Sequence, residues 1–240
     1  MKLLEYSTED FYENGMREYP LFFRGLYAVI LGILFAFSKV MWRCSIEGEE
    51  RVTQSGTGCV VICNHTSMAE VIITVVDLWR RGRRVRPLFK SEFANSSFVE
   101  WAFARVGGII LNRGTADLKA VRRAQHALQR GEDILIYPEG TRVRSDDQPV
   151  EMHGGFALIA SMAKAPVVPM AVVGARDITP AGKRIPRPVK VWIRAGEPVR
   201  LSDAPEGLKR REKCDWMEAE ALSRMTALRD ELRTEHPGRR

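Results

Sequence analysis

Residues 59–80 read CVVICNHTSMAEVIITVVDLWR, and this stretch decides the fold. It begins with the short apolar run Cys59–Cys63, passes through a polar turn, and continues as a longer segment, Ala69–Arg80. The first run has the length and composition of a buried strand, and the second has the length of a helix. A strand followed by a helix is the repeating unit of an α/β fold.

The same alternation continues along the chain. The predicted strands are Cys59–Cys63, Pro87–Lys90, Ile109–Leu111, Ile134–Tyr137, Val167–Val173 and Val189–Ile193. The predicted helices are Ala69–Arg80, Ser97–Val106, Asp117–Arg130 and Phe156–Ala163. Because helices usually connect parallel strands, we predict an α/β fold with a single mixed, largely parallel sheet flanked by helices.

An apolar segment near the N-terminus, GLYAVILGILFAFS, occupies residues 25–38. It is shorter than the roughly 20 apolar residues that span a bilayer, so we predict an interfacial or half-inserted helix. The acidic residues upstream argue against a cleaved signal peptide, which begins with basic residues. A buried core helix is the alternative, but an aromatic fringe at residues 19–27 favours membrane contact.

The composition favours anionic partners. The 240-residue chain carries a net charge of +7, and five of its arginines follow the helix predicted up to Arg80. They are Arg80, Arg81, Arg83, Arg84 and Arg86. Such a cluster is either a solvated loop or a contact for anionic lipid headgroups or the phosphates of an acyl carrier. Stacking aromatics do not alternate with the basic residues, so we expect no nucleic acid partner.

The four cysteines form no CxxC pair and have no zinc-ligand spacing. This pattern predicts reduced, buried residues and no metal site. Cys59 and Cys63 fall within an apolar strand, and we do not assign either as a nucleophile.

The polar turn after the first strand is Asn64-His65-Thr66-Ser67-Met68-Ala69-Glu70. Active sites of α/β proteins lie beyond the carboxyl ends of the strands, and a histidine there can act as a general base. The carboxylate of Glu70 can hold the ring of this histidine in one orientation. However, Ser67 and Glu70 also form a capping-box pattern, so Glu70 has two competing interpretations.

Three further segments end or lie on predicted strands. Gly107–Arg113 ends in an arginine suited to gripping a phosphate, although a surface arginine in a turn has the same pattern. Tyr137-Pro138-Glu139-Gly140-Thr141-Arg142 is a tight turn with an acid, a hydroxyl and an arginine. Ala165–Val172 has no reactive group and predicts an apolar wall.

In this order, the four segments resemble the four motifs of the glycerolipid acyltransferases, the 1-acylglycerol-3-phosphate acyltransferase family. The resemblance covers roughly Ile46 to Arg200, and YPEGTR is its most specific part. It implies that His65 is the catalytic base. Glu70 stands where the family usually has Asp, and the lipid A acyltransferases, which are distant relatives, also tolerate Glu at such a site. It further implies a substrate-binding set of Lys90, Arg113, Glu139, Gly140, Thr141 and Arg142.

The resemblance implies transfer of a fatty acyl group to the free hydroxyl of lysophosphatidate, which gives phosphatidate. The acyl donor would be a thioester of coenzyme A or of acyl carrier protein, with no cofactor and no metal. The expected partners are the lipid bilayer, the lysophospholipid acceptor and, as one of the two donors, acyl carrier protein. There are two alternatives. The enzyme acylates another lysolipid or glycerol 3-phosphate, or the protein is a catalytically weak lipid-binding member of the fold.

These expectations divide the chain into three parts. Residues 1–45 form a membrane-associating helical segment, residues 46–204 the acyltransferase domain, and residues 205–240 a C-terminal helix with a frayed tail. Leu222, Met225, Leu228 and Leu232 have the spacing of one face of that helix. We expect the protein at the cytoplasmic face of the cell membrane, as a monotopic or peripheral protein.

Overall fold

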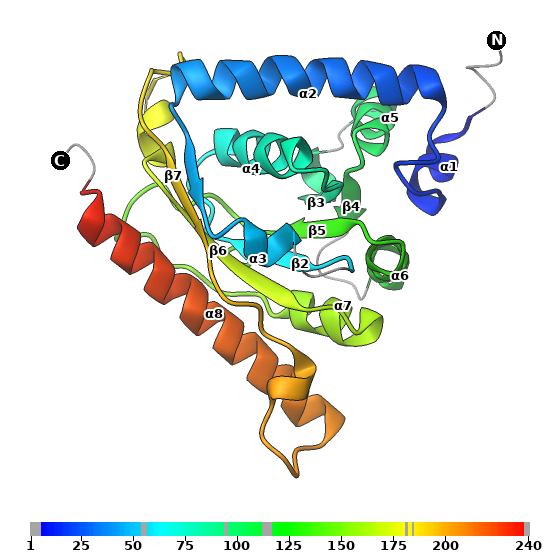
Figure 1. Ribbon diagram of the computed structural model, residues 1–240, viewed down its shortest axis with the longest axis vertical. Helices are drawn as coiled ribbons and strands as arrows, with labels where there is room; N and C mark the ends of the chain where they lie inside the picture. Colours follow the sequence, from blue (N-terminus) through cyan, green and yellow to red (C-terminus); the bar gives the residue numbers. More distant parts are fainter. Residues whose placement is uncertain are drawn as a thin grey trace.

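The structure is a computed structural model that describes residues 6–53, 57–93, 96–111, 117–180, 182–183 and 185–237. Within these residues the strands form one sheet in the order β1-β7-β6-β2-β5-β3-β4 (Figure 1). The strands are β1 (Ser45–Glu47), β2 (Val60–Cys63), β3 (Val85–Lys90), β4 (Ile109–Leu111), β5 (Asp133–Ile136), β6 (Val167–Val173) and β7 (Trp192–Ala195).

The helices lie mostly between these strands in the sequence. The α-helices are α1 (Thr8–Glu13), α2 (Leu21–Met41), α3 (Glu50–Thr53), α4 (Met68–Arg80), α5 (Ser97–Arg105), α6 (Leu118–Gln129), α7 (Gly155–Ala163) and α8 (Arg210–Glu235). Short 3-10 helices are η1 (Ser91–Phe93), η2 (Ala175–Ile178) and η3 (Leu201–Asp203).

The sheet is mixed and largely parallel, as the sequence predicted. Strands β6, β2, β5, β3 and β4 pair in parallel, whereas β7 pairs with β6 in the antiparallel direction. Strand β1 pairs in parallel with β7 and closes one edge. Every residue of β2 is buried, because helices cover both faces of the central strands.

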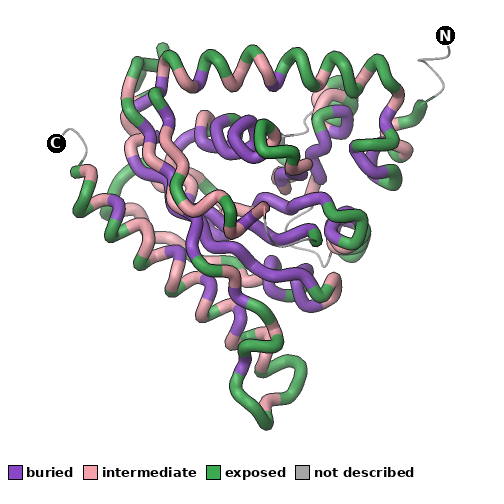
Figure 2. Tube along the Cα trace, in the orientation of Figure 1, coloured by how far each residue is buried: buried purple, intermediate pink, exposed green. Residues whose placement is uncertain are grey.

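The helices form layers on the two faces of the sheet. Figure 1 shows α4 against one face with α2 outside it, and α6, α7 and α8 against the other face. Val61 and Cys63 of β2 point into the core beneath α4, whereas Val60 and Ile62 point into the core on the α6–α8 side. Figure 2 shows the buried centre of the sheet between these layers. Helix α2 is largely exposed on its outer side.

The N-terminal segment is attached to the sheet through a buried ion pair. The guanidinium Nε of Arg86 in β3 lies 2.6 Å from the Glu132 carboxylate at the start of β5. Arg86 also donates to the carbonyl oxygens of Phe11 and Asn14, and Glu132 accepts from the backbone N–H of Met16. These bonds join α1 and the loop after it to two central strands.

Most predicted elements are confirmed, and the exceptions lie at the sheet edge and the N-terminus. The last strand was predicted at Val189–Ile193 but is β7, two to three residues later. Val189 and Val191 bond instead to the backbone carbonyls of Met41 and Trp42 after α2. Helix α1 and the three-residue edge strand β1 were not predicted, because neither is long enough to show an apolar period.

The sheet order brings the sequence motifs together. Neighbouring parallel strands β2, β5, β3 and β4 carry at their carboxyl ends the His65 turn, the Tyr137–Arg142 turn, Lys90 and Leu111, respectively. Side chains distant in sequence therefore lie at one edge of the sheet, which is where α/β folds place their sites.

Candidate active site

His65 lies in the loop between β2 and α4, where its side chain is 12% exposed. Its Nδ1 atom lies 2.6 Å from Oε1 of Glu70, which is buried in the first turn of α4. With Nδ1 engaged by a carboxylate, Nε2 is the ring nitrogen that remains available to a hydroxyl group. This pair has the arrangement of a general base held in one tautomer by a carboxylate.

Glu70 also caps α4, so the contacts of its carboxylate are compatible with both interpretations. Its Oε1 accepts the backbone N–H groups of Thr66 and Ser67, and its Oε2 accepts the Thr66 hydroxyl at 3.0 Å. Ser67 completes the capping box at the helix N-terminus. A buried carboxylate with this many donors is well compensated for its lost hydration.

Glu139 holds the backbone of the same loop. Its Oε2 accepts the backbone N–H of His65 at 2.6 Å, and its side chain is buried. Burial raises the pKa of Glu139 to about 7, and the nearby Glu70 carboxylate raises it further, while the bond from His65 opposes the rise. The YPEGTR turn is therefore joined to the catalytic candidate through a carboxylate whose charge changes near neutral pH.

The ring of Tyr137 stacks on the imidazole of His65. The two ring centroids lie 4.3 Å apart, and the planes meet at 29°. Tyr137 was not among the predicted site residues, although an aromatic residue at the end of β5, directly before Pro138, is the signal that could have identified it. Its ring restricts the orientation of His65 from the side opposite to solvent.

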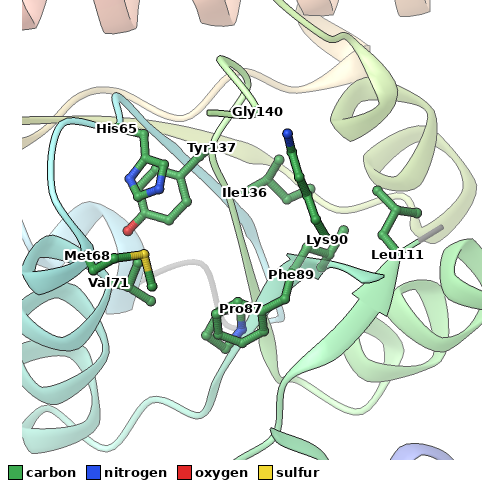
Figure 3. Close-up of a pocket in the computed structure, with 11 residues that line it drawn as sticks. His65, Met68, Val71, Pro87, Phe89, Lys90, Leu111, Ile136, Tyr137 and Gly140 are labelled. Atoms are coloured by element: carbon green, nitrogen blue, oxygen red, sulfur yellow. The ribbon is translucent and has the colours of Figure 1, made fainter. Parts of the chain in front are cut away.

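Two pockets meet at His65, and the first is apolar. Its wall includes Met68, Val71, Phe89 and Ile136, with His65 at its mouth (Figure 3). Figure 3 also shows Lys90 extending from the end of β3 toward the turn at Gly140. Such a pocket suits a hydrocarbon chain.

The second pocket is basic. It lies between His65, Lys90 and the 140–148 loop, and it is lined by Gly140, Thr141, Arg142 and Arg144, with Glu92 and Gln148. Gly140 has φ +62°, a backbone conformation that glycine adopts without strain and that allows the tight turn. Lys90 and Arg142 were predicted, whereas Arg144 was not, because nothing in its sequence context distinguishes it from a surface arginine.

Among the described polar residues near the motifs, Asn64 and His153 line neither of these pockets. Arg113 lies outside the described residues, since β4 ends at Leu111 and the description resumes at residue 117. Asn64 is structural: its side chain exchanges two hydrogen bonds with the backbone of Val172 in β6. The side chain of His153 is exposed, and its backbone N–H binds the carbonyl of Pro138.

The cysteines do not join the site. Cys59 and Cys63 are fully buried, and burial raises the pKa of both thiols well above the ordinary value. Neither thiol is therefore disposed to ionise as a nucleophile. Within the described part of the chain, no cluster of three or more His, Cys, Asp and Glu side chains is arranged to hold a metal ion.

Several known acyltransferases resemble this chain. The model of the family described as Acyltransferase matches residues 43–173. The chain is 27% identical over 143 residues to 1-acyl-sn-glycerol-3-phosphate acyltransferase BAT2, chloroplastic, of Brassica napus, which covers 59% of this chain and 40% of that protein. It is 26% identical over 147 residues to 1-acyl-sn-glycerol-3-phosphate acyltransferase of Bacillus subtilis, covering 61% and 69%, respectively.

A solved structure has the same fold. The 1-acyl-sn-glycerophosphate acyltransferase PlsC from Thermotoga maritima superposes with a TM-score of 0.60 and 22% sequence identity, covering 85% of this chain and 82% of that one. The chain spans about two fifths of the length of its Brassica relative. The family match, which includes the His65 and Tyr137–Arg142 turns and extends over more than half of the sequence, shows that the chain belongs to the acyltransferase family.

Proposed function

We propose that this protein is a 1-acylglycerol-3-phosphate O-acyltransferase that converts lysophosphatidate to phosphatidate at a membrane surface. The observation that carries this proposal is the position of the His65–Glu70 pair, which opens on an apolar pocket and a basic pocket at once. An acyl chain fits the first and a phosphate the second. The relatives from Brassica napus and Bacillus subtilis bear the name of this activity.

The reaction joins the acceptor hydroxyl to the acyl carbonyl carbon of a thioester. Nε2 of His65 takes the hydroxyl proton as the oxygen attacks, the carbon–sulfur bond then breaks, and the departing thiolate receives the proton. Glu70 stabilises the imidazolium that forms between these steps. General base catalysis of this kind contributes roughly 10²–10⁴-fold. Both coenzyme A and acyl carrier protein supply a suitable thioester.

The basic pocket positions the acceptor. Lys90 and Arg142 line it beside His65, and we assign them to the acceptor phosphate together with Arg113. Gly140 and Thr141 form the turn beneath that phosphate, and Glu139 shapes the turn by holding the backbone of His65. Positioning the hydroxyl against the base is a large part of the barrier in a two-substrate reaction.

Helix α2 supports a position of the site at the membrane. It is the one described helix long and apolar enough to cross a bilayer, with a mean hydropathy of 2.0 over its most apolar window. However, Tyr27, Leu31 and Leu34 pack against the domain core along its length. A helix held in this way lies in the plane of the interface, so we propose a monotopic or peripheral enzyme on the cytoplasmic face.

The test is thioester-dependent acylation of lysophosphatidate by the detergent-solubilised protein, with both donors. We expect wild type to form phosphatidate, and His65→Ala to lose about 10²–10⁴-fold in kcat. His126→Ala, which removes an exposed histidine from α6 on the opposite face of the sheet, is the control and should retain activity.

Two variants separate the roles of Glu70. Glu70→Gln keeps an acceptor oxygen for the helix cap but removes the negative charge, so activity should fall far more than thermal stability. Glu70→Asp keeps the charge and should retain more activity than Glu70→Gln. Acylation of a different lysolipid alone would overturn the assigned acceptor, and inactivity with every acceptor and both donors would overturn the enzymatic proposal.

A further inference from the structure

The arginine run after α4 does not form a uniform solvated loop. Arg83 pairs with Asp133, Arg86 with Glu132, and Arg81 with Glu49. Two arginines of the run, Arg80 and Arg84, have no carboxylate partner within the described part of the chain. Arg80 is exposed, whereas Arg84 is half-buried and its Nη1 donates to the neighbouring carbonyl of Arg83.

Arg84 lines a pocket at the end of α4 that lies farthest from His65. The opposite wall is the first two turns of α2, which contribute Arg24 and Tyr27, and Trp79 and Tyr19 complete it. No acidic side chain lines this pocket in the described structure. Arg24, like Arg84, lacks a carboxylate partner among the described residues, so two uncompensated positive charges face one cavity.

Guanidinium groups are strong donors to phosphate oxygens, because both the donor and the acceptor are charged. Two arginines that face one cavity therefore suit a phosphate group.

The pocket adjoins the apolar surface of α2. Leu21, which lines it, is 79% exposed, and the outer face of the helix continues with exposed Phe22, Leu26, Val29 and Ile33. Arg24 precedes Tyr27 and Leu31 by three and seven residues, so it lies on the side of α2 that faces the domain. A lipid whose chains run beside the outer face would therefore reach the arginines with its headgroup.

We propose that this pocket binds the phosphate of an anionic glycerophospholipid through Arg24 and Arg84. The site is separate from the one that acylates lipid: Trp79 follows Met68 by eleven residues of α4, or about 16 Å along the helix axis. It would fix the orientation of α2 on the membrane, and it does not depend on the acyltransfer reaction.

The experiment measures thermal unfolding of the detergent-solubilised protein with increasing dihexanoyl phosphatidylglycerol and no acyl donor. We expect saturable stabilisation, and weaker stabilisation by dihexanoyl phosphatidylcholine. Arg24→Gln and Arg84→Gln should each raise the apparent Kd about fivefold.

Two controls locate the lipid. Arg80→Gln makes the same charge change at the same end of α4 but outside the pocket, and Arg142→Gln alters the basic pocket beside His65; both should leave the apparent Kd unchanged. An equal effect of Arg80→Gln would reduce the result to general surface charge and overturn the proposal. Loss of binding through Arg142→Gln alone would place the lipid in the active site.

Inorganic phosphate separates the two sources of the ligand. If phosphate alone stabilises the protein as much as phosphatidylglycerol and with the same dependence on Arg24, the pocket holds a soluble anion and the lipid assignment is wrong. Arg24 is exposed on α2, so Arg24→Gln keeps the test decisive if Arg84→Gln does not fold.

Discussion

Glu70 shows how one side chain can hold a candidate base and cap a helix at the same time. Its carboxylate receives His65, two backbone N–H groups and the Thr66 hydroxyl, so the base is held by the same group that begins α4. The glutamate stem reaches from the first turn of the helix back over the loop, which explains how Glu replaces the Asp more usual in similar proteins. Orientation of His65 is thus coupled to formation of the helix.

The neighbouring Glu139 gives a pH dependence of stability. In the folded protein its carboxyl has a pKa of about 7, raised mainly by burial from the ordinary value of 4.5. Between these two values the folded state binds more protons than the unfolded state, so stability falls as pH rises through this window. The full effect is at most about 3 kcal/mol.

Glu139→Gln should remove this slope, because glutamine does not ionise. We expect the free energy of unfolding of the variant minus that of wild type to increase as the pH rises from 5 to 8. Chemical denaturation at several pH values measures this difference, and Glu151→Gln, at an exposed position, is the control. A difference that stays constant with pH would show that Glu139 is ionised throughout the range.

The sequence located the chemistry of the site better than its surroundings. His65, Glu70 and Arg142 were predicted because they belong to motifs that begin at strand ends, and Lys90 because it lies where similar proteins often have a lysine. Tyr137 was missed as a ring partner of His65, since stacking depends on how two loops from β2 and β5 approach each other. Local sequence does not encode that distance.

At the scale of elements, the site depends on how β2 ends. Asn64 follows the last residue of the strand and pairs with Val172 in β6, at 2.9 Å to its carbonyl and 2.8 Å from its N–H. The side chain of Asn64 thereby continues the hydrogen bonding between β2 and β6 by one residue, where the backbone of β2 turns away. This pairing fixes the point at which the His65 loop leaves the sheet.

Asn64→Ala should therefore destabilise the protein by about 2–4 kcal/mol, because it leaves two buried backbone groups of Val172 without partners. Asn14→Ala makes the same substitution at an exposed position and should change stability by less than about 0.5 kcal/mol. Urea denaturation compares the two variants. Equal stability of both would mean that Val172 finds other partners and that the extra hydrogen bonding has little weight.

Elements with a strong apolar period were predicted to within a few residues, and the edge of the sheet was not. Strand β7 extends through Arg194, whose guanidinium bonds to Glu47 and Glu235. A charged residue in a strand next to the edge hides the strand pattern, and its ion pairs are visible only once β1 and α8 lie beside β7. Pairing between distant segments decides such edges.

At the scale of the whole molecule, the layers give the two outer faces opposite characters. On one side, α2 covers α4 and exposes a continuous apolar face; on the other, the amphipathic helix α6 and the polar helix α8 face solvent. A large exposed apolar face marks an interaction site. The exposed apolar face of α2 lies on the outside of the layer that contains α4, and we therefore assign this face to the membrane.

Val29 and Ile33 lie one turn apart on this face and are 60% and 65% exposed. Changing both to glutamate removes apolar surface and adds charge, while leaving the core beneath α2 untouched. We expect the Tm in detergent to change little and partitioning into phospholipid vesicles to fall about tenfold or more, since burying each aliphatic side chain contributes about 1.5–3 kcal/mol.

The matched control is the same double change on the opposite side of the sheet, at Leu118 in α6 and Leu158 in α7, which are 62% and 49% exposed. That variant carries the same added charge, so it should repel anionic vesicles equally if charge alone governs partitioning. Reduced co-sedimentation of the α2 variant alone would place the membrane against α2. Equal reduction in both variants would contradict this orientation and leave the apolar face of α2 to a protein partner.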